Sequence, residues 1–103
     1  MTYKGTVGDS DSTIRSNTLP TSNVSVGDTY AVNEVGDIIG NIEGGSGSPK
    51  KKACHVGDIL IAQGSEDEST GYITSGLTWS YIPAGDIDTQ YSLAISTGQD
   101  PSF

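Results

Sequence analysis

The only cysteine and the only histidine of the chain are neighbours, Cys54 and His55. Such a pair could supply a thiolate nucleophile or half of a metal site. Adjacent residues of a strand point to opposite faces, so these two side chains cannot form a dyad with each other. One cysteine and one histidine also exclude a Cys/His zinc site within a single copy. We therefore expect Cys54 to be a small, buried apolar residue.

Three consecutive carboxylates, Glu66-Asp67-Glu68, form the second stretch with chemical potential. Paired carboxylates do acid–base work when burial or a fixed geometry moves their pKa values apart. Here Ser and Gly flank them and no apolar residue is adjacent, which predicts a solvated loop tip. A small hydrolase would have to use His55 and these loop carboxylates, and we expect no enzymatic activity.

Aspartate recurs in a Val-Gly-Asp step. Glycine can adopt a positive φ, and an aspartate carboxylate can accept hydrogen bonds from nearby backbone N–H groups. The aspartates could instead share a ligand such as calcium, but none has the spacing of an EF-hand loop. We therefore predict that each step turns the chain into a strand, and that the protein holds no metal or cofactor. The four instances are Val7-Gly8-Asp9, Val26-Gly27-Asp28, Val35-Gly36-Asp37 and Val56-Gly57-Asp58.

An aromatic stripe follows near residue 80. Leu77, Trp79 and Tyr81 share one face of an alternating strand, opposite Thr78 and Ser80. Such a stripe could stack on carbohydrate, form a protein-contact patch or close a small core. Because apolar residues are scarce in this chain, we predict that Trp79 lies in the core.

The elements that would position these residues are all strand-like. Residues 59–62, Ile-Leu-Ile-Ala, are a short continuous apolar run, which is typical of a strand covered on both faces. Residues 2–7 predict a first strand. Residues 24–32 predict a turn followed by a strand with Tyr30 and Val32 on one face. Residues 91–95 again alternate, and Leu19 is the one apolar anchor of a polar loop.

Composition sets the fold class. The chain has 103 residues, 33% of them hydrophobic, and 14 glycines. A domain of this size supports one modest core. We predict an all-β fold, a small antiparallel sandwich or partly open barrel with long polar loops. Residues 1–86 would form the β-domain, and residues 87–103 a C-terminal strand and polar tail packing on it or on a partner.

The charge balance limits the partners. Five basic residues against thirteen acidic ones give a net charge of −8, which argues against nucleic-acid binding. No apolar stretch approaches the length of a membrane span, and residues 1–5 lack a signal-peptide core. We expect synthesis in the cytoplasm and no membrane attachment. Lys50-Lys51-Lys52 follows a Gly/Ser-rich loop, and would be either a docking arm for an acidic neighbour or a solvated loop that protects strand edges.

The order of these segments resembles a small β-domain of tailed-bacteriophage structural proteins, of the head decoration or head-fibre type. An aromatic-Lys-Gly-Thr opening leads to a Leu-Pro loop, a Val-Gly-Asp-x-Tyr-x-Val strand, a Gly-Asp-apolar strand and a Trp-containing closing strand. Residues 35–52 and the C-terminal extension depart from that pattern. The resembling residues are Tyr3-Lys4-Gly5-Thr6-Val7-Gly8, Thr18-Leu19-Pro20, and residues 26–32, 53–62 and 79–86.

The resemblance implies a non-enzymatic virion structural role. It implies a capsid decoration protein on the capsid surface, which binds the major capsid protein through a terminus or an edge strand. The chain would be a homo-oligomer or be present in many copies on a lattice, and its contact residues are not specified by the resemblance. The alternative is a glycan-binding adhesin module associated with a tail fibre, with Trp79 or Tyr81 exposed.

Overall fold

The computed structural model describes residues 1–84, and six β-strands are the only regular elements that lie wholly within them. The all-β prediction is confirmed. No helix in this part of the chain has the length and apolar character needed to cross a membrane. The strand predicted at residues 91–95 and the polar tail lie outside the described residues. The strands are β1 (Thr2–Val7), β2 (Asp28–Val32), β3 (Gly36–Ile39), β4 (Lys51–Cys54), β5 (Ile59–Glu66) and β6 (Ile73–Ile82).

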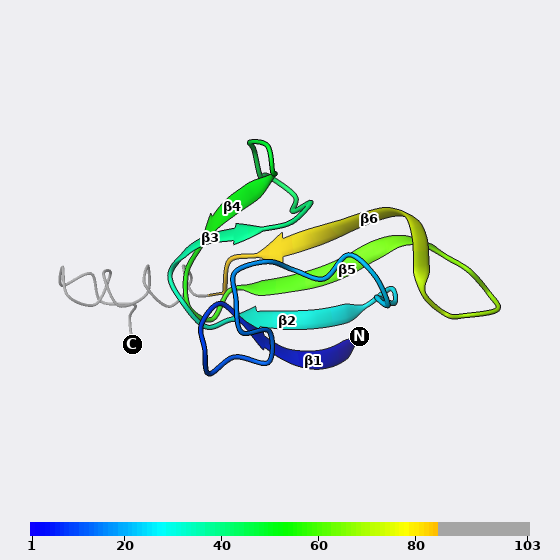
Figure 1. The fold of residues 1–103 in the computed structure, drawn as a ribbon, viewed down its shortest axis with the longest axis horizontal. Helices are drawn as coiled ribbons and strands as arrows, with labels where there is room; N and C mark the ends of the chain where they lie inside the picture. The colour runs from blue at the N-terminus through cyan, green and yellow to red at the C-terminus, as the bar shows by residue number, and fades with distance from the viewer. Residues whose placement is uncertain (85–103) are drawn as a thin grey trace, which may run out of the picture.

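The main sheet has four strands in the order β1-β2-β5-β6 (Figure 1). β2 pairs with β5 and β5 with β6 in antiparallel fashion, whereas β1 pairs with β2 in parallel. A parallel pair needs a long connection that returns the chain to the same end of the sheet. The loop of residues 8–27 makes that return.

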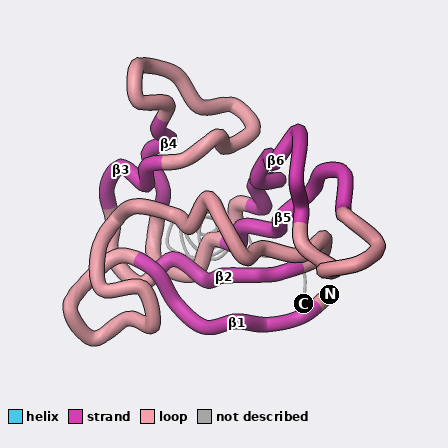
Figure 2. Tube along the Cα trace, turned by 45° about the vertical axis from the view of Figure 1, so that its right-hand side comes forward, coloured by secondary structure: helices cyan, strands magenta, loops and turns pink. Residues whose placement is uncertain are grey.

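A second, smaller sheet is the antiparallel pair of β3 and β4, in which Gly36 pairs with Cys54 and Ile39 with Lys51. Two isolated bridges tie this layer to the rest of the chain: Thr18 to Ile39, and Ile42 to Trp79 of β6. Figure 2 shows β3, β4 and the loop between β1 and β2 on one side of the main sheet. The fold is therefore two layers, of which the second is part sheet and part loop.

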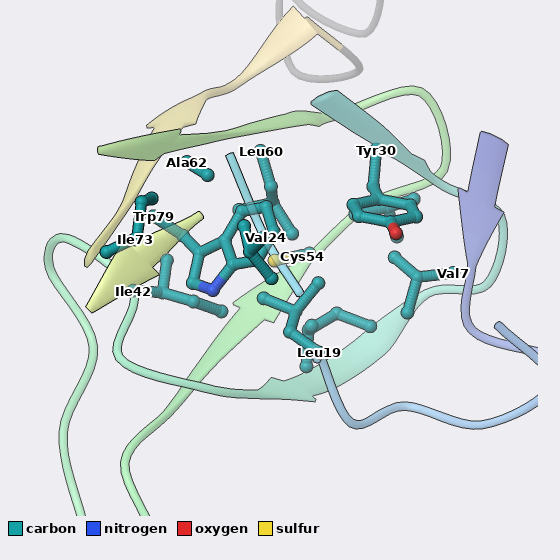
Figure 3. Packing of buried hydrophobic residues seen from close by; sticks show 12 residues of the cluster. Val7, Leu19, Val24, Tyr30, Ile42, Cys54, Leu60, Ala62, Ile73 and Trp79 are labelled. Carbon is teal, nitrogen blue, oxygen red and sulfur yellow. The ribbon is translucent and has the colours of Figure 1, made fainter. Parts of the chain in front are cut away.

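The core lies between these layers (Figure 3). Trp79 is only 1% exposed and its ring lies 5.7 Å from that of Tyr30, at an angle of 59°. This tilted arrangement is one of the favoured aromatic geometries. The predictions that Trp79 and Cys54 are buried and that Leu19 anchors its loop are confirmed. The core cluster contains Val7, Leu19, Val24, Tyr30, Val32, Ile38, Ile42, Cys54, Leu60, Ala62, Ile73 and Trp79.

The central strand β5 differs from its prediction. Leu60 and Ala62 are completely buried in the core, whereas Ile59 and Ile61 point to the other face and are half-buried. Within residues 1–84, the second layer covers only one face of the main sheet (Figure 2). The described fold therefore covers this apolar run on one side, not on both.

Candidate functional site

Two of the four Val-Gly-Asp steps form the same turn. The N–H of Asp28 donates to the carbonyl of Ser25 at 3.1 Å, and the N–H of Asp58 donates to the carbonyl of His55 at 3.0 Å. In return, each aspartate Oδ2 accepts the N–H of that first residue, at 3.0 Å and 2.8 Å. The glycine at the third turn position has a φ of 90° in the first case and 97° in the second.

Asp58 lies among several chemically capable side chains, those of His55 and Tyr81. It is completely buried, and its Oδ2 also accepts a 2.6 Å hydrogen bond from the Tyr81 hydroxyl. The Nδ1 atom of His55 lies 3.9 Å from the same oxygen, and the Lys52 Nζ lies 4.4 Å from the centroid of the Tyr81 ring. A carboxylate, a phenol and an imidazole therefore meet at one place.

The geometry assigns Asp58 a structural task. Asp28 makes the same bond in the same turn, so closing the turn accounts for the aspartate at both positions. The tyrosine hydroxyl adds a bond that ties the turn to the end of β6. Cys54 is 1% exposed and donates to the Lys52 carbonyl at 3.4 Å, while the His55 side chain is 55% exposed, so the two diverge as predicted.

The other two Val-Gly-Asp steps do not form this turn. Asp9 Oδ1 accepts from the Ser12 hydroxyl at 2.8 Å and from the Asp11 N–H at 3.0 Å. These bonds, the first above all, lower the pKa of Asp9. Asp37 is exposed within β3, and its carboxylate lies 4.0 Å from Lys51 Nζ. The prediction that each step turns the chain into a strand is therefore wrong for residues 7–9, which lie at the end of β1. Residues 35–37 do lead into β3, but Asp37 does not close a turn there.

Of the three carboxylates predicted at a loop tip, Asp67 and Glu68 lie in the β5–β6 loop, whereas Glu66 is the last residue of β5 and pairs with Ile73. Glu66 Oε1 accepts the N–H of Val26 at 2.6 Å. Asp67 accepts the hydroxyl and the N–H of Ser69 at 2.7 and 2.8 Å, which lowers the pKa of Asp67. The hydrogen bonds from Ser69 stabilise the ionised form of Asp67, which is the form of an acceptor and not of a general acid.

The lysine run lies at the start of β4. Lys50 Nζ donates to Asn41 Oδ1 at 3.1 Å, and Lys51 and Lys52 have the contacts with Asp37 and Tyr81 given above. All three lysines therefore touch their own chain. Exposed contacts of this type contribute little to stability and leave the charges open to a partner.

An open pocket of about 320 Å³ lies between the loop after β1 and the start of β3. Residues 34–38 line it together with Gly8, Ser16 and Asn17. Its carboxylates are those of Glu34 and Asp37, of which Asp37 lies beside Lys51. No group of three or more His, Cys, Asp or Glu side chains within residues 1–84 is arranged to hold a metal ion.

The aromatic residues of β6, Trp79 and Tyr81, make contacts within the protein itself. Trp79 lies in the core, so its ring face is not available to stack on a sugar, and the half-buried Tyr81 bonds to Asp58. Sequence reasoning missed this last bond, because residues 58 and 81 share no local pattern. It also missed that Ile59 and Ile61 face away from the core.

Comparison of the chain with protein-family models, with curated proteins and with solved structures gave no match.

Proposed function

We propose that this chain is a structural protein of a bacteriophage virion, namely a capsid decoration subunit of the head-fibre type. It acts by binding the major capsid protein in many copies and catalyses no reaction. It would lie on the outer surface of the capsid.

One observation carries this proposal. The stretches that resemble the phage structural domain include most of β1, all of β2, the first half of β5 and the last four residues of β6, together with the end of β4 and the buried anchor Leu19. The resemblance therefore falls mainly on the main sheet and its core. This supports a shared fold, from which the virion role is extended by analogy.

The contacts of the chemically capable side chains also support a binding role over a catalytic one. The buried aspartates close turns and Trp79 fills the core, so the groups with chemical potential are engaged in holding the fold. Apolar surface remains at the N-terminal end, where Met1 is 90% exposed and Val26 is 44% exposed. The two residues adjoin, because the Thr2 N–H donates to the Gly27 carbonyl at 2.9 Å. We propose this end as the contact with the capsid protein.

The test is electron microscopy of heads assembled with and without the protein, together with co-sedimentation of the purified chain with empty heads. Val26→Ser should weaken head binding by roughly tenfold, because burying a valine side chain contributes about 1.5 kcal/mol. Val56→Ser is the matched control, since Val56 occupies the same position in the second turn and is 56% exposed. It should bind as the parent does.

Absence of extra density on heads, with no co-sedimentation, would overturn the proposal. Hits on a glycan array in that case would favour the adhesin module instead, with an exposed tyrosine in place of Trp79 as the stacking residue.

A further inference from the structure

Lys50 and Lys52 form a positively charged row on one face of β4. Lys50 continues the pairing of β4 with β3, because the Gly40 N–H donates to its carbonyl at 2.9 Å. Residues two positions apart on an extended strand project to the same face, with their Cα atoms about 6.6 Å apart. Lys51 projects to the opposite face, where its Nζ lies 4.0 Å from Asp37. The row therefore consists of two of the three consecutive lysines.

Contacts with the β6 side of the molecule hold both lysines of the row in place. Lys50 Nζ donates to Asn41 Oδ1 at 3.1 Å, and Asn41 Nδ2 donates in turn to the Leu77 carbonyl of β6 at 2.9 Å. Lys52 Nζ lies 4.4 Å from the centroid of the Tyr81 ring. Both lysines are half-buried. Their side chains are therefore partly ordered before a partner arrives, which reduces the entropy cost of binding.

These contacts do not neutralise the two positive charges. The chain has thirteen acidic residues, yet among residues 1–84 neither Lys50 nor Lys52 forms an ion pair with a carboxylate. An ammonium group has three hydrogen-bond donors. Lys50 directs one of them to Asn41, and the ammonium group of Lys52 faces a ring. Both positions therefore retain donors for a carboxylate from outside the described part of the chain.

The surroundings of the row limit how far an anionic partner can extend. Asp37 lies beside Lys51, and the exposed Glu43 precedes Gly44, whose backbone lies close to the Lys52 side chain. The chain as a whole carries a net charge of −8. A nucleic acid or another long polyanion would continue past the row onto this negative surface, where repulsion would offset its contacts with the lysines. A short segment with a few carboxylates would stay within the row.

We propose that this row binds an acidic peptide segment of a partner protein, in an extended conformation with carboxylates at alternate positions. Alternate side chains of such a segment repeat at the spacing of Lys50 and Lys52, so each carboxylate faces one ammonium group. The row lies away from the N-terminal end that is offered to the capsid protein (Figure 1). The inference therefore goes beyond the proposed function and does not depend on it.

The contact is weak and sensitive to salt. Exposed ion pairs contribute little each, and salt screens them. We expect a dissociation constant on the order of 1 mM at low ionic strength. It should rise by about tenfold at roughly 0.5 M NaCl, where the Debye length is about 4 Å. Such an affinity becomes effective when the partner and this chain are held close together in many copies.

The test is an NMR titration of the full chain, at low salt, with a synthetic peptide of alternating Glu and Thr. Lys50→Gln and Lys52→Gln should each raise the dissociation constant about three- to fivefold, as expected for the loss of one exposed ion pair. Lys52→Arg keeps the charge and the contact with the aromatic ring, so it should bind as the parent does. Lys4→Gln is the matched control, because it removes the same charge from an exposed position of β1 and should leave binding unchanged.

A second measurement covers the case in which the Gln variants fail to fold. In the parent chain, the peptide should shift the resonances of Lys50, Lys52 and Tyr81, and a peptide of alternating Gln and Thr should not. No binding of the acidic peptide at millimolar concentration would overturn the inference. So would shifts confined to other residues, or equal losses in the Lys4→Gln control.

Two further outcomes would replace the occupant and so overturn the inference. A single-stranded DNA oligomer that binds the row more tightly than the peptide would assign it to polyanions. Asp86 and Asp88 are alternate carboxylates of the chain itself. Peptide binding that appears only in the double variant Asp86→Asn, Asp88→Asn would assign the row to that segment. The capsid proposal is independent of all these results, because head binding is tested at Val26.

Discussion

At the scale of single residues, the aspartates decide how the chain turns. Asp28 and Asp58 each accept the N–H of the residue three positions earlier, and each leads directly into the strand region that follows. Buried carboxylates are tolerated when hydrogen bonds replace the lost water. Asp58 has one further bond, from the Tyr81 hydroxyl, and this bond reaches across 23 positions of the sequence.

Asp58→Ala should therefore cost more stability than Asp28→Ala. We expect a loss of about 3 kcal/mol for the first and about half of that for the second, because hydrogen bonds to charged groups contribute roughly 1.5–3 kcal/mol. Urea unfolding monitored by Trp79 fluorescence measures both. Tyr81→Phe is the control for the added bond and should have little effect in an Asp58→Ala background. Equal losses at the two aspartates would show that the tyrosine bond contributes nothing.

At the scale of elements, the two equivalent turns place β2 and β5 side by side in the sheet. Each turn precedes its strand, and the strands pair in antiparallel fashion, with Tyr30 opposite Leu60. The second turn also continues the ladder, because the Gly57 N–H donates to the Val32 carbonyl at 2.9 Å. The repeated motif thus builds the centre of the main sheet.

Gly57→Ala should destabilise the protein by about 1–2 kcal/mol, since an L-residue side chain is strained at positive φ. Gly27→Ala should have a similar effect, because its φ is nearly the same. Asn tolerates this backbone region better, so Gly57→Asn should recover part of the loss. Thermal unfolding gives the comparison. An unchanged melting temperature in both alanine variants would mean that the turns are not needed in this conformation.

At the scale of the whole molecule, charge opposes both folding and self-association. Thirteen acidic residues against five basic ones leave a net charge of −8 on a small domain. Close ion pairs relieve little of this, since Lys51 and Asp37 are 4.0 Å apart and both about half exposed. Screening by salt should therefore act in favour of the compact state.

Raising NaCl from about 0.05 M to about 0.5 M, which shortens the Debye length from roughly 14 Å to 4 Å, should raise the melting temperature by a few degrees. KCl at the same concentrations is the control for an ion-specific effect and should give the same shift. A melting temperature that falls with salt would show that attractive charge pairs dominate over the repulsion.

Local features of the sequence were sufficient to predict the all-β class, the turns at Asp28 and Asp58, and the burial of Trp79. Turn chemistry depends on adjacent residues, and scarce apolar side chains must be used for the only core that such a chain can build. The same local evidence failed at Asp9, where the chain leaves β1 and does not enter a strand, because the tripeptide alone does not specify which backbone groups lie beside the carboxylate.

Only the tertiary structure decided which distant segments meet. The parallel pairing of β1 with β2, the bond between Tyr81 and Asp58, and the contact of Trp79 with residues 41–43 join positions that share no local pattern. It also decided that Leu60 faces the core while Ile61 faces outward, because strand geometry assigns alternate faces but packing chooses which face is covered.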